Sequence, residues 1–412
     1  MLSLDKIFIL KKLIINYLSL DKHILLLIRA QFFIHLVGAA FFLILNIYLS
    51  KQGFSDPDIA NFISYRFLAV MALAFPLGFY IRKKKLKPFF IFGSLGVPII
   101  AISLVLLIEN GLYRYLNISF VLWGVVFTLF QVCSLPYIMR NTEMTKQSHA
   151  ISLSYATHSF GSILSGLIIF VFGKFAVNMH EGLILLLISI FGFFGFYYVL
   201  KIKKDEINDE DIKFKFQSYN WKLLLNAIIP TLIIAIGAGL TIPFINLFFY
   251  HNFQVDSSKF ALIGGVSSIL VAFMALLVPP LKNKLGFRKG ITYSQSSAVL
   301  ALIILATMEF YSDFIWALPI AVIFYWLRAP LMNMAAPMTS ELTMNYVGEK
   351  NQEMLSAIMA AIWSGSWFFS SQIFRWLKSI ELSYAYIFYI TAVLYAFGIL
   401  MYYLLILDYE KR

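Results

Sequence analysis

The sequence predicts an all-α polytopic membrane protein whose twelve transmembrane helices form two pseudo-symmetric bundles of six. Composition is the first reason: of 412 residues, 60% are hydrophobic and only 13% are charged. A soluble domain has about 45–50% apolar and about 25% charged residues. The second reason is an alternation along the whole chain between basic loops, such as residues 82–87, and apolar runs. Runs of about 20 apolar residues are long enough to cross the hydrocarbon core of a bilayer.

Twelve apolar runs are separated by polar or charged segments. They lie near residues 23–50, 57–81, 88–108, 117–139, 150–173, 182–200, 223–250, 258–281, 291–309, 315–338, 354–376 and 384–407. The connecting segments on one side of the predicted membrane, which include both termini, carry 24 Lys or Arg residues, against five on the other side. Because basic loops stay in the cytoplasm, we expect both termini to be cytoplasmic. The short loops favour a prokaryotic inner membrane.

The longest polar stretch divides the chain into two halves. We expect a cytoplasmic N-terminal lead-in over residues 1–22, a six-helix bundle over 23–200, a cytoplasmic linker over 201–222, a second six-helix bundle over 223–407 and a cytoplasmic tail over 408–412. Landmarks in the two halves are equally spaced. Gly78 and Pro279 precede matching basic loops, Pro136 and Pro337 lie near the ends of matching spans, and each pair is 201 residues apart. The halves therefore look like copies of one duplicated unit.

Several classes of function are excluded by what the sequence lacks. The formal net charge of +12 is explained by loop orientation, so we expect no nucleic-acid partner. The chain has no Walker-type phosphate loop, no H-E-x-x-H, no G-x-S-x-G and no His/Cys cluster with metal-ligand spacing. Its single cysteine, Cys133, cannot form a disulfide framework. We therefore expect no enzyme, no cofactor and no metal site.

The loop after the eighth span reads Pro279-Pro280-Leu281-Lys282-Asn283-Lys284-Leu285-Gly286-Phe287-Arg288-Lys289. It resembles the signature G-x-L-x-D-R-x-G-R-R/K of the major facilitator superfamily, with Asn283 in place of the Asp and Pro279 in place of the first Gly. The first-half loop keeps Gly78 and a basic run, but Arg82 stands where the Asp belongs. The resemblance implies a secondary transporter in which these loops take part in gating. Its gating residues here would be Gly78, Arg82, Asn283, Lys284, Gly286, Arg288 and Lys289.

Ionisable side chains inside the predicted spans are few, and none near the middle of a span is Asp or Glu. A charge at the bilayer centre costs about 2.5–3.5 kcal/mol on insertion scales, so it needs a partner or a function. In the family, the first, fourth, seventh and tenth spans line a central cavity. The resemblance therefore implies that the substrate meets His35, Gln131, Asn246, Arg328 and Asn333. Trp363 and Trp367 lie one turn apart on the eleventh span and would form an aromatic wall.

Each of these side chains also has a purely structural explanation. Arg328 either binds an anionic substrate group or donates to backbone carbonyls freed near Pro330 and Pro337. Arg66 lies in the second span, which usually packs beside the cavity, so a structural role is favoured for it. His35 either contacts substrate or takes part in coupling to a proton, since histidine changes charge near neutral pH, or it is a hydrogen-bonded packing residue.

The sequence as a whole favours a monomeric secondary active transporter that moves a small organic anion by rocker-switch alternating access. Its expected partners are the small solute, the lipid bilayer and a coupling proton or ion. Three alternatives remain open at this stage: an amphiphile, lipid or drug efflux transporter of the same fold, a non-transporting sensor on this scaffold, and a membrane-embedded enzyme. The lack of intramembrane carboxylate pairs argues against the enzyme.

Overall fold

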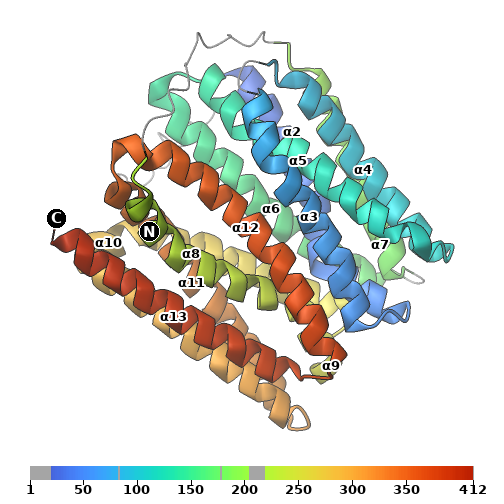
Figure 1. Ribbon diagram of the computed structural model, residues 1–412. Coiled ribbons are helices and arrows are strands. Elements are labelled where there is room, and N and C mark those ends of the chain that lie inside the picture. Colours follow the sequence, from blue (N-terminus) through green and yellow to red (C-terminus); the bar gives the residue numbers. More distant parts are fainter. Residues whose placement is uncertain (1–19, 82–83, 177–178, 204–218, 412) are drawn as a thin grey trace, which may run out of the picture.

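The computed structural model describes residues 20–81, 84–176, 179–203 and 219–411. These residues form helices and short connections, with no strand among them (Figure 1). The first half contains α2 (Lys22–Lys51), α3 (Asp56–Tyr80), α4 (Lys87–Glu109), η2 (Tyr113–Tyr115), α5 (Leu116–Asn141), α6 (Met144–Phe175) and α7 (Glu181–Leu200). The second half contains α8 (Trp221–Thr241), η3 (Ile242–Phe244), α9 (Ile245–Phe253), α10 (Ser257–Thr307), η4 (Met308–Tyr311), α11 (Ala317–Val347), α12 (Glu349–Ser379) and α13 (Tyr384–Glu410).

Twelve membrane-spanning segments follow from these helices, as the apolar runs predicted. In the described residues, eleven segments are long and apolar enough to cross a membrane. The helix α12 is the remaining one, and its sequence is less apolar than the others. Two of the eleven lie within α10, which contains both the eighth and the ninth predicted span.

The connection within α10 differs from the loop that the sequence predicted. Residues on both sides of it are helical, and only Gly286 departs, with φ 66° and ψ −177°. A residue with a side chain rarely adopts this positive φ, whereas glycine does so without a steric cost. The glycine of the loop signature therefore makes the turn that separates two antiparallel spans.

Two other predicted spans differ from the helices: one helix continues into polar sequence, and another span is divided. The tenth span was predicted to end at residue 338, but α11 runs to Val347, past the internal Pro330 and Pro337. Neighbouring helices tolerate such prolines in membrane proteins. The seventh span is divided at Pro243 into α8, the short 3-10 helix η3 and α9. Both changes matter for the cavity and for the contacts between the halves.

Local capping fixes where several helices begin. The Asp21 carboxylate accepts from the backbone N–H of His23 at the start of α2, and Asp256 accepts from that of Lys259 at the start of α10. Asn220 does the same for Leu223 at the start of α8. Each cap satisfies a backbone donor that the helix itself leaves unpaired.

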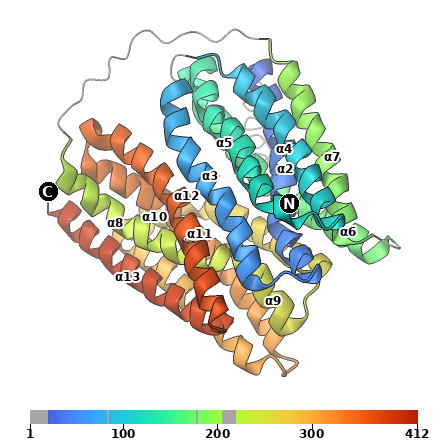
Figure 2. The same cartoon turned by 45° about the vertical axis from the view of Figure 1, so that its right-hand side comes forward.

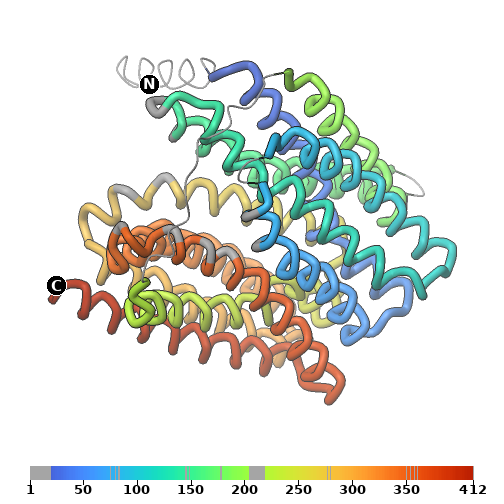
Figure 3. Tube along the Cα trace, turned by 45° about the horizontal axis from the view of Figure 1, so that its top comes forward, coloured from blue at the N-terminus to red at the C-terminus, as the bar shows by residue number. Residues whose placement is uncertain are grey.

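The two halves form separate bundles that lie side by side (Figures 1 and 3). They touch mainly along two helix pairs, α3 with α12 and α6 with α10. The second crossing is close because Gly166 faces the Ala261 carbonyl, which an added Cβ would approach to 2.6 Å. Small residues allow helix backbones to come this near in a membrane protein.

We distinguish two ends of the molecule. The linker end holds Lys203 and Tyr219, the residues that flank 204–218. The closed end holds α9 and the starts of α3 and α10, and here the bundles meet (Figure 2). Residues 1–19 of the predicted lead-in, 204–218 of the predicted linker, and Arg82 lie outside the described residues.

A reciprocal asparagine contact joins α2 to the η3–α9 region near the closed end. The Asn46 Nδ2 donates to the Pro243 carbonyl at 2.6 Å and to the Asn246 Oδ1 at 3.0 Å. The Asn246 Nδ2 donates to the Leu43 carbonyl at 3.1 Å. The two asparagines are 200 residues apart, and each donates to the carbonyl three residues before the other. This pseudo-twofold arrangement supports the duplication inferred from the sequence.

Candidate functional site

A cavity of about 630 Å³ lies between the two bundles. Its walls come from α2, α3, α5 and α6 on one side and from α8, α10, α11, α12 and α13 on the other. The lining reaches Thr343 and Met344 in the last turns of α11, so the cavity extends from the middle of the helices toward the linker end. Its size is within the range of small-molecule sites.

The wall from the first half carries the positive charge. The Arg66 guanidinium lies near the ring faces of Phe67, Trp123 and Phe127, with centroid distances of 5.8, 5.9 and 5.4 Å. Aromatic faces attract a cation, especially where water is excluded. Among the described residues Arg66 has no ion-pair partner, and no Asp or Glu lines the cavity. Arg66 is therefore a positive charge at the cavity wall that no carboxylate of the described residues balances.

Two histidines stand close together on the same wall. The rings of His35 and His158 are 5.5 Å apart at an angle of 66°. The His35 Nδ1 lies 2.9 Å from the Thr157 hydroxyl, which itself donates to the Ser154 carbonyl at 2.6 Å. Since that hydroxyl proton is in use, His35 Nδ1–H is the donor in the first contact. This leaves the Nε2 of a neutral His35 ring as an acceptor.

The wall from the second half is rich in hydroxyls and aromatic rings. The polar side chains on it are Thr231, Gln295, Asn333, Thr339, Ser340, Thr343, Tyr395 and Tyr402. The Thr231 and Tyr402 hydroxyls are 2.6 Å apart. Trp363 and Trp367 lie on the same side, and Trp367 meets Phe67 of the opposite bundle edge-to-face at 5.0 Å. This wall suits hydrogen bonding and ring contacts rather than charge pairing.

Arg328 lies behind this wall and not on the cavity surface. Its side chain is buried, and its Nη2 donates to the Tyr395 hydroxyl at 3.0 Å, while Tyr395 itself lines the cavity. Its Nε is buried without a hydrogen-bond partner in the described part of the chain. In the same described residues, Arg328 makes no hydrogen bond to the backbone carbonyls near Pro330 and Pro337, which was the structural alternative for this residue. Arg328 therefore reaches the cavity only through Tyr395.

The structure brings five of the seven expected substrate residues to the cavity: His35, Gln131, Asn333, Trp363 and Trp367. Arg328 and Asn246 are placed elsewhere, the first behind Tyr395 and the second in the asparagine contact near the closed end. Asn246 points away from the cavity because the break at Pro243 turns the end of the seventh span toward α2. Whether the five lining residues bind substrate stays a prediction.

Sequence reasoning missed two parts of the lining. Arg66 was favoured as a structural residue, yet it is the arginine that the cavity exposes. The shortage of carboxylates in all spans was the signal that pointed to an unpaired cation, but it did not distinguish Arg66 from Arg328. The hydroxyls of Thr339, Ser340 and Thr343 were missed because the tenth span was ended at residue 338.

The expected gating residues surround the turn in α10 and the matching part of α3. Asn283, Lys284, Arg288 and Lys289 are exposed at the linker end. Arg288 donates to the Tyr403 hydroxyl, and its guanidinium lies 4.9 Å from that ring. The neighbouring Lys282 pairs with Glu341 of α11 at 2.5 Å. These contacts stay within the second bundle, and their role in gating stays a prediction.

In the first bundle the basic loop is held by a residue that sequence reasoning did not include. Arg140, near the end of α5, donates to the Ile81 and Lys84 carbonyls at 3.1 Å each. Gly78 lies in α3 with open space beside its Cα. The side chain of an arginine on a neighbouring helix thus binds the backbone carbonyls of this loop. In the family signature this region would contain a carboxylate.

Two bundles of membrane-spanning helices around a central cavity with polar walls define a membrane transporter rather than an enzyme. The family model of the major facilitator superfamily matches residues 27–371, so this chain belongs to that superfamily. The sequence matches no curated protein.

Solved structures similar to this chain are transporters of the same superfamily. A mutant of the nucleoside transporter NupG superposes with a TM-score of 0.74 at 11% identity, covering 93% of this chain and 99% of its own. The D-xylose-proton symporter gives a TM-score of 0.73 at 11% identity, covering 92% and 95%. The POT family transporter PepTSo gives 0.75 at 10% identity, covering 95% and 99%. These likenesses show the fold, and their different cargoes assign none to this chain.

Proposed function

We propose that this protein is a secondary active transporter of a small organic anion, and that it works by rocker-switch alternating access. The observation that supports the anion is Arg66, which lines a cavity where no Asp or Glu is present among the described residues. A guanidinium binds a carboxylate or phosphate through two parallel hydrogen bonds, which gives both affinity and orientation. Placing an unpaired charge in a membrane helix is expensive, so a binding function accounts for its presence.

The rest of the lining narrows the kind of anion. The rings of Phe42, Phe67, Phe127, Trp363 and Trp367 provide apolar contact area. Hydroxyls of the second-half wall can both donate and accept hydrogen bonds. An acid with an apolar or aromatic body and at least one further polar group fits these walls. In this proposal His35, Gln131, Asn333 and the two tryptophans contact the substrate, while Arg328 and Asn246 act indirectly, through Tyr395 and through the contact between the halves.

Alternating access is supported by the arrangement of the two bundles. They are joined at the closed end, and the cavity extends toward the linker end, as in a transporter open to one side. Because basic loops, the start of α2 and the end of α13 lie at the linker end, we propose that this side is cytoplasmic, in a prokaryotic inner membrane. We further propose bundles at 23–200 and 223–407 connected by a cytoplasmic linker at 201–222, a monomeric state, and coupling to a proton or ion in which His35 takes part.

A ligand panel sorted by charge tests the substrate class. The purified protein is heated with monocarboxylates, dicarboxylates, organic phosphates, neutral solutes and organic cations, and the shift of its unfolding midpoint is recorded. A ligand at 100 times its Kd that binds only the folded state should stabilise by about 2.7 kcal/mol. We expect stabilisation by acids, lost in Arg66→Gln and kept in Arg29→Gln, since Arg29 is exposed beside Tyr198 and outside the cavity.

Two outcomes would contradict the proposal. Stabilisation by neutral or cationic solutes that survives Arg66→Gln would make Arg66 a packing residue. Stabilisation only by long-chain amphiphiles would favour the lipid or drug efflux alternative, for which the aromatic lining is the specific observation. Uptake of a stabilising acid into proteoliposomes then separates a transporter from a sensor that binds without transport.

A further inference from the structure

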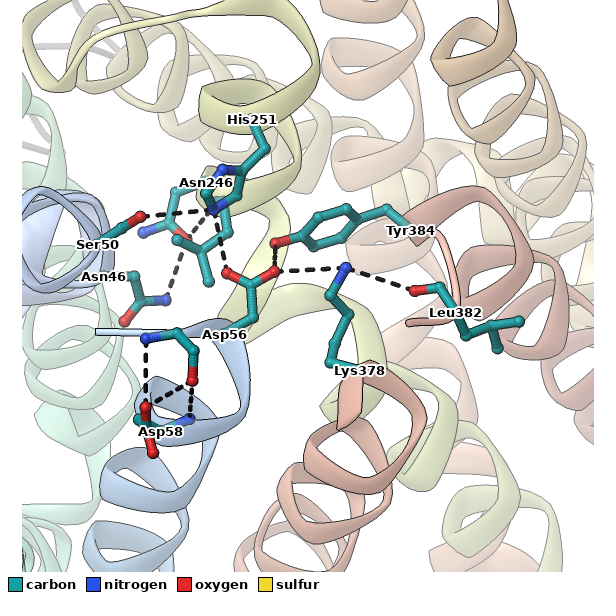
Figure 4. A network of polar contacts seen from close by, with 11 residues as sticks. Asn46, Ser50, Asp56, Asp58, Asn246, His251, Lys378, Leu382 and Tyr384 are labelled. Carbon is teal, nitrogen blue, oxygen red and sulfur yellow. Dashed lines mark hydrogen bonds and ion pairs between the residues drawn. The ribbon is translucent and has the colours of Figure 1, made fainter. Parts of the chain in front are cut away.

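A single carboxylate at the closed end contacts three different elements of the other bundle. Asp56 is the first residue of α3. Its Oδ1 accepts from the His251 Nε2 of α9 at 3.0 Å, and its Oδ2 accepts from the Tyr384 hydroxyl of α13 at 2.5 Å. The same Oδ2 lies 3.4 Å from the Lys378 Nζ of α12. Figure 4 shows these side chains converging on Asp56.

Three of the four side chains in this cluster are largely shielded from solvent, whereas His251 is exposed. The side chains of Asp56 and Lys378 are 11% and 15% exposed, and Tyr384 is buried. Lys378 also lies 4.1 Å from the centre of the Tyr384 ring. A carboxylate that has lost water is stable only while its hydrogen-bond donors and opposite charge remain in place. All three donors come from the second bundle, so Asp56 depends on the contact between the halves.

The nearby Asp58 shows what an ordinary acidic residue does at this helix start. Its Oδ2 accepts from the hydroxyl and the backbone N–H of Ser55, at 2.5 and 3.3 Å, and its own N–H reaches the Ser55 hydroxyl at 3.4 Å. Asp58 is exposed, and these bonds cap the beginning of α3. Two acidic residues within one turn thus have different partners: Asp58 stabilises its own helix, and Asp56 holds the other bundle.

Further bonds follow the same helix pair toward the cavity. The Arg375 Nη1 donates to the Asn61 Oδ1 at 3.0 Å, and the Gln372 Nε2 donates to the Ser64 hydroxyl at 2.6 Å. The Phe67–Trp367 ring contact comes next, at the cavity wall. The interface of α3 and α12 is therefore a row of contacts between Asp56 and the cavity, and Asp56 is the member with the most partners.

We infer that Asp56 is the latch residue of this transporter, the side chain that keeps the closed end shut while the cavity is open at the linker end. For the cavity to open at the closed end, α3 must move away from α9, α12 and α13 together. Because the three contacts share one carboxylate, losing one weakens the others, and the end behaves as a two-state element. Asp56 does not line the cavity, so it acts on the conformational equilibrium and not on substrate contact.

Distances between spin labels in the full-length protein test this inference, which rests on the alternating access proposed above. Labels are placed at Gln52→Cys and Lys259→Cys, two exposed positions of opposite bundles at the closed end, in a Cys133→Ala background. In the labelled protein with Asp56 intact, the two labels should give one short distance. We expect Asp56→Asn to raise the population with a longer distance by about tenfold or more, while the matched Asp58→Asn stays like the parent.

Two single-donor variants cover the case in which Asp56→Asn does not fold. Lys378→Gln and Tyr384→Phe each leave the carboxylate with two partners, so each should produce a smaller rise of the long-distance population. Identical distance distributions for the latch variants and Asp58→Asn would overturn the inference. The measurement needs no ligand, so it can fail or succeed separately from the anion hypothesis, which is judged by the ligand panel.

Discussion

Each cavity wall contains an arginine of a membrane-spanning helix, and the two arginines differ in their exposure to the cavity. In the first bundle, Arg66 lies on the cavity surface among three aromatic rings, without an ion-pair partner among the described residues. In the second bundle, Arg328 is covered by Tyr395 and donates to its hydroxyl. The same side chain carries the same cost in a membrane. The comparison teaches that exposure to the cavity, and not depth in a span, separates a candidate ligand-binding cation from a supporting one.

The largest expected effect is the loss of affinity for a stabilising acid when Arg66 is replaced. Arg66→Gln removes a charged partner whose hydrogen bonds contribute about 1.5–3 kcal/mol, so the affinity for a stabilising acid should fall about 100-fold. Arg66→Lys keeps the charge but not the planar fork and should lose less, about tenfold. Both affinities are measured by isothermal titration with the acid found in the panel. Equal losses in Arg66→Lys and Arg66→Gln would show that charge alone does not govern binding.

The next effect concerns Tyr395, which stands between Arg328 and the cavity. Tyr395→Phe leaves the buried Arg328 without its hydroxyl acceptor and should lower the free energy of unfolding by about 1–3 kcal/mol. Arg328→Met removes the charge together with the need for that acceptor. Adding Tyr395→Phe to Arg328→Met should therefore cost much less than Tyr395→Phe alone, which a double-mutant cycle of thermal unfolding measures. Additive costs would mean that the two side chains do not act together.

The smallest expected effect belongs to the reciprocal asparagine contact. Interhelical hydrogen bonds in membrane proteins contribute about 0.6 kcal/mol on average, so Asn46→Leu should reduce the free energy of unfolding by about that amount. Asn246→Leu should have a similar effect because the contact is nearly symmetric. Neither variant should alter anion affinity, since both residues lie outside the cavity. A loss of affinity as large as that of Arg66→Gln would return Asn246 to the substrate site.

Local sequence signals predicted much of the fold. Apolar runs and basic loops located the twelve spans, because burial in lipid requires about 20 apolar residues whichever neighbours a helix has. The signature around Gly286 located the turn inside α10, where a positive φ requires glycine. Boundaries were less accurate where helices continue past prolines into polar sequence, as α11 does to Val347.

The cavity was predictable only in part. His35, Gln131 and Asn333, expected there from the family resemblance, and Trp363 and Trp367, expected there from their helical spacing, line the cavity, whereas Asn246 and Arg328 are not part of its lining. The rotation of a helix about its axis decides which side chains face the cavity. In spans that are apolar on nearly every face, the hydrophobic period does not report that rotation.

By itself the sequence determined that this chain is a membrane protein of two related six-helix halves, because hydrophobicity and loop charge act residue by residue. Only the tertiary structure decided that Arg66 meets the cavity while Tyr395 covers Arg328. It alone brought Asp56 to His251, Lys378 and Tyr384, which are separated from it by 195 or more positions in the chain. Such contacts depend on how two bundles pack against each other. No local pattern of residues specifies which side chains so far apart in the sequence will meet.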